Sequence, residues 1–417
     1  MLCQEIVLSS LRCLSAQPFR AGQIYFRFSS QVLRQHITAY HNDINMAGTE
    51  SKAERDLKSL KTTVESVSSL IAQLLAAIKV ESPSEDEKDP KEVNAIDLAH
   101  DAATLIKAYS TKLSLLLINA PFTPTAIMAV LREVSSGPLP ALATSVELCN
   151  CEIYTRVMRS ELQWRVEKVL VEFQTLVGDI PLDGKVLSNE RRNGTVAGMG
   201  KGSLAATGVV WGACDDVVEL KELGIGGLMI KKVQQYRDTV KDALEELQEW
   251  GEETSEDEEE DELHEAAGNG NGFCNPAQDA IDDMFRDQHH IPVSDVHKVR
   301  ERLECTLRRL KLINLLFQAI IKRRLKPLPA MPHTSASTTI TTRLDTLMPL
   351  LSCIPDYVDD LASAFYTLDD PGINAQMIEC FSTASAAAEA LYTSWEGKQD
   401  EFSVWSEKFV KAMAEVW

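Results

Sequence analysis

The sequence predicts an all-α protein with two helical bundles of four or five helices, joined by an acidic disordered linker. Along most of the 417 residues, hydrophobic side chains recur at alternating steps of three and four, the spacing that places one apolar stripe on a helix. Aromatic residues make up only 6% of the chain, and no strand-like alternation of useful length is visible. A helix with one apolar stripe must bury it against other helices, so the pattern predicts bundles.

The first bundle is predicted over residues 46–250. Its first helix begins at a capping box, Ser51-Lys52-Ala53-Glu54, and runs to about Val80, because the serine and glutamate side chains satisfy free N–H groups of the first turn. Residues 141–177 contain no glycine or proline, which favours one continuous helix there, and Gly224 divides the last two helices. The other helices are expected over 92–119, from Pro124 to Gly137, and over 203–223 and 225–250.

The second bundle is predicted over residues 291–417. Its first helix covers 294–326, where Val296, Leu303, Leu310 and Phe317 recur every seven residues. Pro327 ends this helix, since proline lacks the N–H group that a helix interior needs. Further helices are expected over 338–353, 356–367, 373–394 and 399–416.

Residues 251–290 are predicted to be the disordered linker. They hold fourteen acidic side chains and one basic side chain, Arg286, for a net charge of −13. Like-charge repulsion and low hydrophobicity keep such a segment open. Thr254 and Ser255 have acidic residues three positions on, and so does Ser84. This pattern is preferred by acid-directed kinases, so the three are candidate phosphorylation sites; the alternative is a solvated segment with incidental hydroxyl groups.

The charge and cysteine content exclude several classes of protein. The chain carries −20, and subtracting the −13 of the linker leaves only −7 for all other residues. Direct binding of nucleic acid needs a basic face, which this balance disfavours. No apolar run reaches the roughly 20 residues that a membrane span needs. The nine cysteines are scattered without a Cys-x-x-Cys pair, which is typical of reduced thiols in the cytoplasm or nucleus.

Residues 1–45 differ from the rest of the chain. Arg12, Arg20, Arg27 and Arg34 lie among serines with few acidic residues, as in an amphipathic mitochondrial transit peptide. Two other interpretations are a disordered tail and a start codon assigned too early, with Met46 as the true start. We expect the protein in the cytoplasm and nucleus, and mitochondrial import through residues 1–45 is the alternative.

No motif of an enzyme, a cofactor site or a metal site is evident. Residues 198–203 resemble a phosphate-binding loop, but that motif needs glycine where Thr195 stands and serine or threonine where Gly202 stands. We interpret these glycines as a flexible lead-in to the next helix. No group of histidines and cysteines has the spacing of a zinc site. The sequence predicts a non-enzymatic protein without cofactor or metal.

A basic cluster ends the long helix of the second bundle. Its charged members are Lys322, Arg323, Arg324 and Lys326. They can complement the negative end of the helix dipole, or they can form a nuclear-import patch.

Residues 204–215 read Leu-Ala-Ala-Thr-Gly-Val-Val-Trp-Gly-Ala-Cys-Asp, and they resemble the Val-Trp-x-Ala-Cys motif of the cyclin-D-binding (GCIP-like) protein family. The acidic run after Trp250 and the long helix after Val293 match the family's organisation. The resemblance implies an all-helical fold similar to talin-rod or vinculin-type bundles. It also implies a non-enzymatic adaptor that binds cyclin-type or helix–loop–helix proteins and restrains cell-cycle progression or transcription.

Trp211 and Cys214 are the candidate partner-binding residues of this motif. They lie three positions apart, which predicts one shared helical face. Core packing is the favoured interpretation, because buried tryptophan and cysteine are common; a docking groove is the alternative.

A bundle enzyme or ligand carrier and a cytoskeletal scaffold are the two alternative functions.

Overall fold

The computed structural model describes residues 51–80, 93–194, 202–252, 291, 295, 297–331 and 337–414. Every regular element in these ranges is a helix and none is a strand, so the all-α prediction is confirmed. Residues 1–45 and residues 253–290 of the predicted linker lie outside these ranges. The three candidate phosphorylation sites, Ser84, Thr254 and Ser255, also lie outside the described residues.

The chain divides into two compact units whose boundary differs from the predicted one. Among the described residues, the first unit contains 51–80, 102–144, 169–194 and 202–212, and the second contains 93–101, 145–168, 213–252 and the described residues from 291 to 414. Helices α4 (Ala95–Ile118), α8 (Arg156–Gly178) and α10 (Ser203–Glu252) each contribute residues to both units. Residues 213–250 therefore group with the C-terminal helices, because the apolar side of a long helix can serve two cores in succession without any break in composition.

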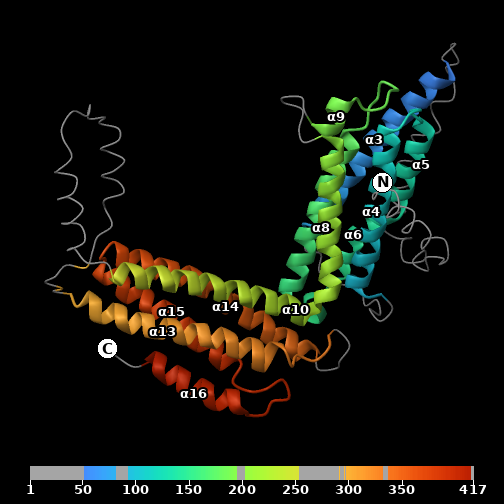
Figure 1. Cartoon of the computed structure of the whole chain (residues 1–417). Helices are drawn as coiled ribbons and strands as arrows, with labels where there is room; N and C mark the ends of the chain where they lie inside the picture. The colour runs from blue at the N-terminus through green and yellow to red at the C-terminus, as the bar shows by residue number, and fades with distance from the viewer. Residues whose placement is uncertain are drawn as a thin grey trace, which may run out of the picture. The chain divides into compact units, whose positions relative to one another are not determined.

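The first unit begins with α3 (Lys52–Ala77), which packs against α5 (Pro124–Ser136) (Figure 1). The predicted capping box is present. The Ser51 hydroxyl accepts from the Glu54 N–H at 3.2 Å, and the Glu54 carboxylate accepts from the Ser51 N–H at 2.8 Å. The stripe of α3 is buried at Leu60, Val67, Ile71 and Leu74, as its spacing predicts.

The single helix predicted over 141–177 is wrong. The structure has α6 (Pro138–Leu148), the short α7 (Cys151–Tyr154) and then α8. The Asn150 side chain accepts from the Glu152 N–H at 2.9 Å, and the Thr155 hydroxyl accepts from the Met158 N–H at 3.2 Å. Asparagine and threonine favour such capping bonds over helix interiors, so two polar side chains end one helix and start the next.

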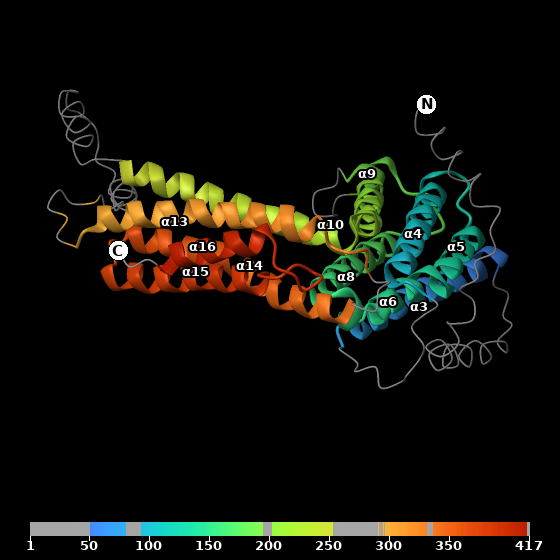
Figure 2. The same cartoon turned by 90° about the horizontal axis from the view of Figure 1, so that it is seen from below.

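The second unit contains the C-terminal part of α10 together with α13 (Val299–Ile320), the π-turn η2 (Ile321–Leu325), α14 (Ser337–Tyr366), α15 (Asp370–Ala390) and α16 (Glu401–Ala414). Both views show the C-terminal part of α10 lying lengthwise beside α13, α14 and α15 (Figures 1 and 2). α15 packs against α13, α14 and α16. One expected bound is wrong: α13 begins at Val299 rather than at residue 294. The Asp295 carboxylate caps its first turn by accepting from the Val299 N–H at 2.6 Å.

α14 continues through two prolines where the sequence predicts two helices. Pro349 and Pro355 both lie inside it. The apolar side is buried before and after Pro355, at Leu351, Ile354 and Val358. This continuous burial outweighs the roughly 3 kcal/mol that a proline costs in a helix interior. Across the described ranges, no helix is both long enough and apolar enough to span a membrane.

Candidate partner-binding face of helix α10

The first turns of α10 have one buried side and one exposed side. Ser203, Thr207, Val210 and Cys214 face inward, with 4% exposure or less. The opposite side is open to solvent and consists of Leu204, Ala205, Gly208, Trp211 and Gly212. These five residues are called the α10 face below.

None of the five residues of the α10 face is charged, and the nearest charge on the same side is the exposed Asp215, one turn after Trp211. From Ser203 to Cys214 the sequence contains no charged residue. Leu204 is 42% exposed and Trp211 is 38% exposed, and a separation of seven residues places them on one side of the helix, two turns apart. Large exposed apolar side chains that lie together mark interaction surfaces.

The centre of the α10 face has no side chains, because Gly208 and Gly212 stand there. A Cβ atom added to Gly208 or to Gly212 would meet no heavy atom within 4 Å. Both positions therefore open to solvent rather than to a packed neighbour. Without side chains here, another helix could bring its backbone close to α10, flanked by Leu204 and Trp211.

The structure separates the two predicted partner-binding residues. Trp211 belongs to the exposed side, whereas Cys214 is fully buried. A shared face for the pair is therefore wrong: three residues turn a helix by about 300°, and the edge of the buried side falls between them. Core packing describes Cys214 but not Trp211. Leu204 and Gly208 lie beside Trp211 on the exposed side, although the sequence did not single them out. The feature that could have indicated them is the run of uncharged residues on a helix that has an exposed side.

Ion pairs fix α10 against α8 directly after the motif. Lys168 Nζ of α8 lies 2.8 Å from Asp216 Oδ2 of α10, while the pair of Lys231 Nζ and Glu219 Oε1, also 2.8 Å apart, lies within α10 on either side of Gly224. Arg165 is only 5% exposed, donates to the Asp216 carbonyl and pairs with Glu219 at 3.4 Å. A buried guanidinium with several acceptors holds one geometry, so this part of α10 has a defined rotation about its axis.

Glu161 of α8 belongs to the same network. Burial alone raises the pKa of its carboxyl group, but the ammonium of Lys232 and the guanidinium of Arg165 outweigh burial, and the pKa lies below its ordinary value. Lys232 Nζ lies 2.9 Å from Glu161 Oε2. The carboxylate is therefore charged at neutral pH and contributes to the attachment of α8 to α10.

The predicted nuclear-import patch loses one of its four members. Arg324 is 1% exposed, and its guanidinium pairs with Asp400 at 2.7 Å and donates to the Leu391 carbonyl at 2.9 Å. It also lies over the Phe402 ring, 4.3 Å from the centroid. Arg324 cannot reach an import receptor from this position, because the π-turn η2 directs it into the second unit. Lys322, Arg323 and Lys326 are exposed, and their role in import remains a prediction.

The comparisons with known proteins bear on the segment that carries the α10 face. Residues 98–253 match a family model described as Grap2 and cyclin-D-interacting, N-terminal. The chain resembles this family. The resemblance inferred from residues 204–215 is thereby confirmed over the matched residues, which include the whole α10 face. An uncharacterised protein of Schizosaccharomyces pombe is 24% identical over 367 residues, covering 87% of this chain and 96% of the relative.

Proposed function

We propose that this chain is a non-enzymatic helical adaptor that binds a protein partner through the α10 face. The observation that carries the proposal is the exposure of Leu204 and Trp211 on an uncharged helix face inside the matched segment. The description of the matching family names cyclin D as an interactor. We therefore propose a cyclin-type partner, with a helix–loop–helix regulator as the second candidate.

The partner segment that fits the α10 face is an amphipathic helix. Helix-in-groove recognition uses apolar anchors at steps of three, four and seven residues, which match the spacing of Leu204 and Trp211. The low centre at Gly208 and Gly212 can receive one large apolar side chain of the partner. An uncharged face supplies affinity by apolar burial, at about 25 cal/mol per Å², rather than by charge.

A binding titration of the full chain with a purified D-type cyclin tests the proposal. Trp211→Ala is expected to weaken binding about 30-fold, since truncating a central tryptophan of an interface costs roughly 2 kcal/mol. Trp164→Ala is the matched control, because Trp164 is 57% exposed but lies on α8. Equal affinities for wild type and Trp211→Ala, or equal losses in both variants, contradict a role of the α10 face.

Gly208→Glu separates loss of binding from loss of folding. The added side chain has open space, and glutamate forms helices better than glycine does, so the variant is expected to fold at least as well as wild type. A charge in the centre of the apolar face is costly to bury, and binding should be lost. Unchanged cyclin binding by this variant would exclude the α10 face as the contact.

We further propose that partner binding restrains cell-cycle progression or transcription and that the protein acts in the cytoplasm and nucleus. Loss of the chain should then shorten the interval before DNA replication, and Trp211→Ala should fail to restore it. Replication timing that does not change on loss of the chain rules out the restraining role. Imaging of the tagged chain tests the location, and a mitochondrial signal would favour import through residues 1–45.

We propose a non-enzymatic role rather than a bundle enzyme because two buried cysteine thiols are in an unreactive state. Burial raises the pKa of the Cys149 thiol to about 12 and that of the Cys380 thiol to about 12. Such thiols stay protonated and are poor nucleophiles at neutral pH. Among the described residues, no group of three or more histidine, cysteine or acidic side chains is placed to hold a metal ion.

A further inference from the structure

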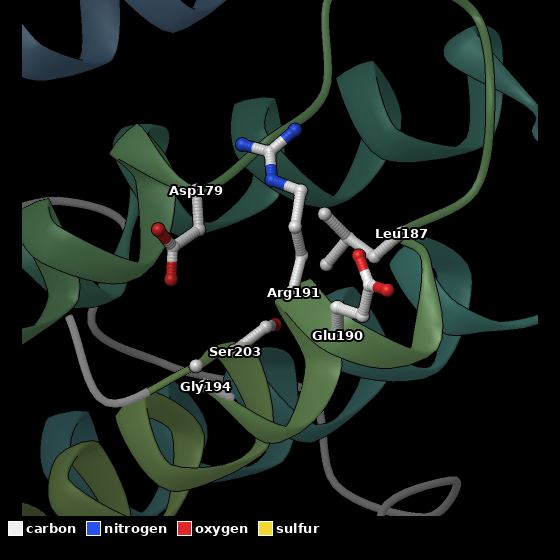
Figure 3. Close-up of a pocket in the computed structure, with 7 residues that line it drawn as sticks. Asp179, Leu187, Glu190, Arg191, Gly194 and Ser203 are labelled. Carbon is white, nitrogen blue, oxygen red and sulfur yellow. The ribbon is translucent and has the colours of Figure 1, made fainter. Parts of the chain in front are cut away.

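A small cavity lies at the N-terminal end of α10, in the first unit. Its volume is about 100 Å³, which is room for more than one water molecule. Three elements meet around it: the residue after α8, the short helix α9 (Asn189–Asn193) and the first residue of α10 (Figure 3). The lining residues are Asp179, Leu187, Glu190, Arg191, Gly194, Gly202 and Ser203.

Ser203 presents an unused polar group to this cavity. Its side chain is 1% exposed, and within the described part of the chain its hydroxyl has no hydrogen-bond partner. An unsatisfied buried hydroxyl is unfavourable, because it loses its hydrogen bonds to water and gains none in the protein. A bound group that hydrogen-bonds Ser203 would remove this cost.

The start of α10 also lies at the cavity, since Gly202 and Ser203 both line it. The Gly202 carbonyl accepts from the Ala206 N–H at 2.9 Å, so Gly202 is the N-cap residue of α10. Glycine has no side chain that could accept from the free N–H groups of the first turn, which serine or aspartate would satisfy. The N-terminus of a long helix with free N–H groups and a positive dipole end favours an anion.

Glycine is required at the N-cap because the backbone around it is crowded. Gly202 has φ +81°, and a Cβ atom there would lie 2.4 Å from the Gly194 nitrogen and 2.8 Å from the Arg192 carbonyl oxygen. A serine or aspartate cap therefore cannot be placed at this position. The end of α9 and the start of α10 are held together, which brings Arg191 to the rim of the cavity.

The rim carries charges of both signs. Arg191 is exposed, and an exposed arginine changes rotamer on a picosecond to nanosecond scale, so its guanidinium can turn toward an anion. Glu190 is also exposed and opposes one. Burial raises the pKa of Asp179, partly offset by the charge of Arg191, and as a carboxylate this group opposes an anion.

We propose that this cavity binds a small oxyanion of the phosphate type, through the Ser203 hydroxyl, the first N–H groups of α10 and the Arg191 guanidinium. No covalent step is involved, and the site does not depend on partner binding at the α10 face. The oxyanion can be free phosphate or a phosphoryl group carried by a larger molecule, since both present the same oxygen atoms to these donors.

Titration of the full chain with inorganic phosphate, against chloride at equal ionic strength, tests the site by calorimetry and by the thermal midpoint. Phosphate is expected to bind and to raise the midpoint. Ser203→Ala and Arg191→Gln are each expected to weaken binding about tenfold or more, the worth of one charge-assisted hydrogen bond. Arg192→Gln is the matched control, since it removes the same charge from α9 but does not line the cavity.

Asp179→Asn decides the sign of the bound charge. It removes a negative charge from the rim, so phosphate should bind more tightly, whereas a cation site would lose affinity. The absence of phosphate binding to wild type, an equal loss in Arg192→Gln and Arg191→Gln, or weaker binding by Asp179→Asn each overturns the proposal. Ser203→Ala removes only an unpartnered hydroxyl, so its unliganded midpoint should not fall.

Comparing inorganic phosphate with O-phosphoserine identifies the source of the oxyanion. Tighter binding of phosphoserine supports the site and assigns it to a phosphorylated side chain. Tighter binding of phosphate supports the site and assigns it to the free ion. Binding of neither by wild type contradicts the site.

Discussion

At the scale of single residues, the position of a charge in the sequence does not determine its environment. Arg323 and Arg324 are neighbours in one basic run, yet Arg323 pairs with Glu401 at the surface while Arg324 is buried against Asp400 and Phe402. Trp395 Nε1 also donates to the Arg324 carbonyl at 2.6 Å. One guanidinium therefore connects η2 with the chain before α16.

Asp400 provides a direct measure of this connection. Its carboxylate pairs with Arg324 and also caps α16, by accepting from the Phe402 N–H at 3.0 Å. Asp400→Asn keeps an oxygen for the cap but removes the charge, and it should lower the free energy of unfolding by about 2 kcal/mol, less than for a fully buried pair because Asp400 is partly exposed. Asp400→Ala should cost about 1 kcal/mol more, the worth of the cap.

Urea unfolding of both Asp400 variants checks this expectation, with Arg323→Gln as the control. Arg323 is half-exposed and its partner Glu401 is 79% exposed, so losing that pair should change stability by less than about 1 kcal/mol. A cost for Arg323→Gln as large as that for Asp400→Asn would contradict the distinction between the two arginines.

At the scale of elements, glycines have opposite effects at different positions of α10. Gly224 has φ +58° and ψ −172°, a conformation outside the helix that divides α10 as the sequence predicts. This region is restricted almost entirely to glycine. Gly212 lies inside a regular helix with open space around it, so an alanine side chain fits there without strain.

Alanine substitutions should therefore change stability in opposite directions. Gly224→Ala is expected to destabilise the protein by about 1–3 kcal/mol, because alanine is strained at this φ. Gly212→Ala should stabilise it by about 0.5–1 kcal/mol, because alanine loses less backbone entropy in a helix. Thermal unfolding of the two variants side by side checks the expectation; a stabilising Gly224→Ala would show that the kink is not needed.

At the scale of the whole molecule, stability depends on pH through two opposing sets of carboxyl groups. The hydrogen bond from Arg324 holds the pKa of Asp400 far below its ordinary value of 3.8. The pKa of Glu161 also lies below its ordinary value of 4.5. Groups with lowered pKa stabilise the fold above the unfolded pKa, and this stability is lost as pH falls through the folded value.

Glu147 and Asp345 belong to the opposite set, because burial raises the pKa of each. The charged forms of these two carboxyl groups oppose folding. Protonation removes this destabilisation as the pH falls through their raised pKa values. Acidification also reduces the self-repulsion of a chain with net charge −20. The free energy of unfolding should thus rise slightly from pH 7 toward pH 5 and then fall below about pH 4.5.

Urea titrations between pH 7 and pH 3 measure this profile. Asp400→Asn should flatten the acid limb, because it removes the group with the most lowered pKa. An acid limb that is equally steep in Asp400→Asn would show that other carboxyl groups cause the loss.

The sequence alone determined the helical fold, the capping box at Ser51, the division of α10 at Gly224 and the family resemblance, since each depends on spacing or on local chemistry. Tertiary structure decided the rest. The grouping of residues 213–250 with the C-terminal helices, the continuity of α14 through Pro355, the burial of Arg324 and the exposure of Trp211 all depend on which side of a helix meets a neighbour. The periodicity of one helix shows that an apolar side exists, but the helix that covers it is fixed only when the chain packs.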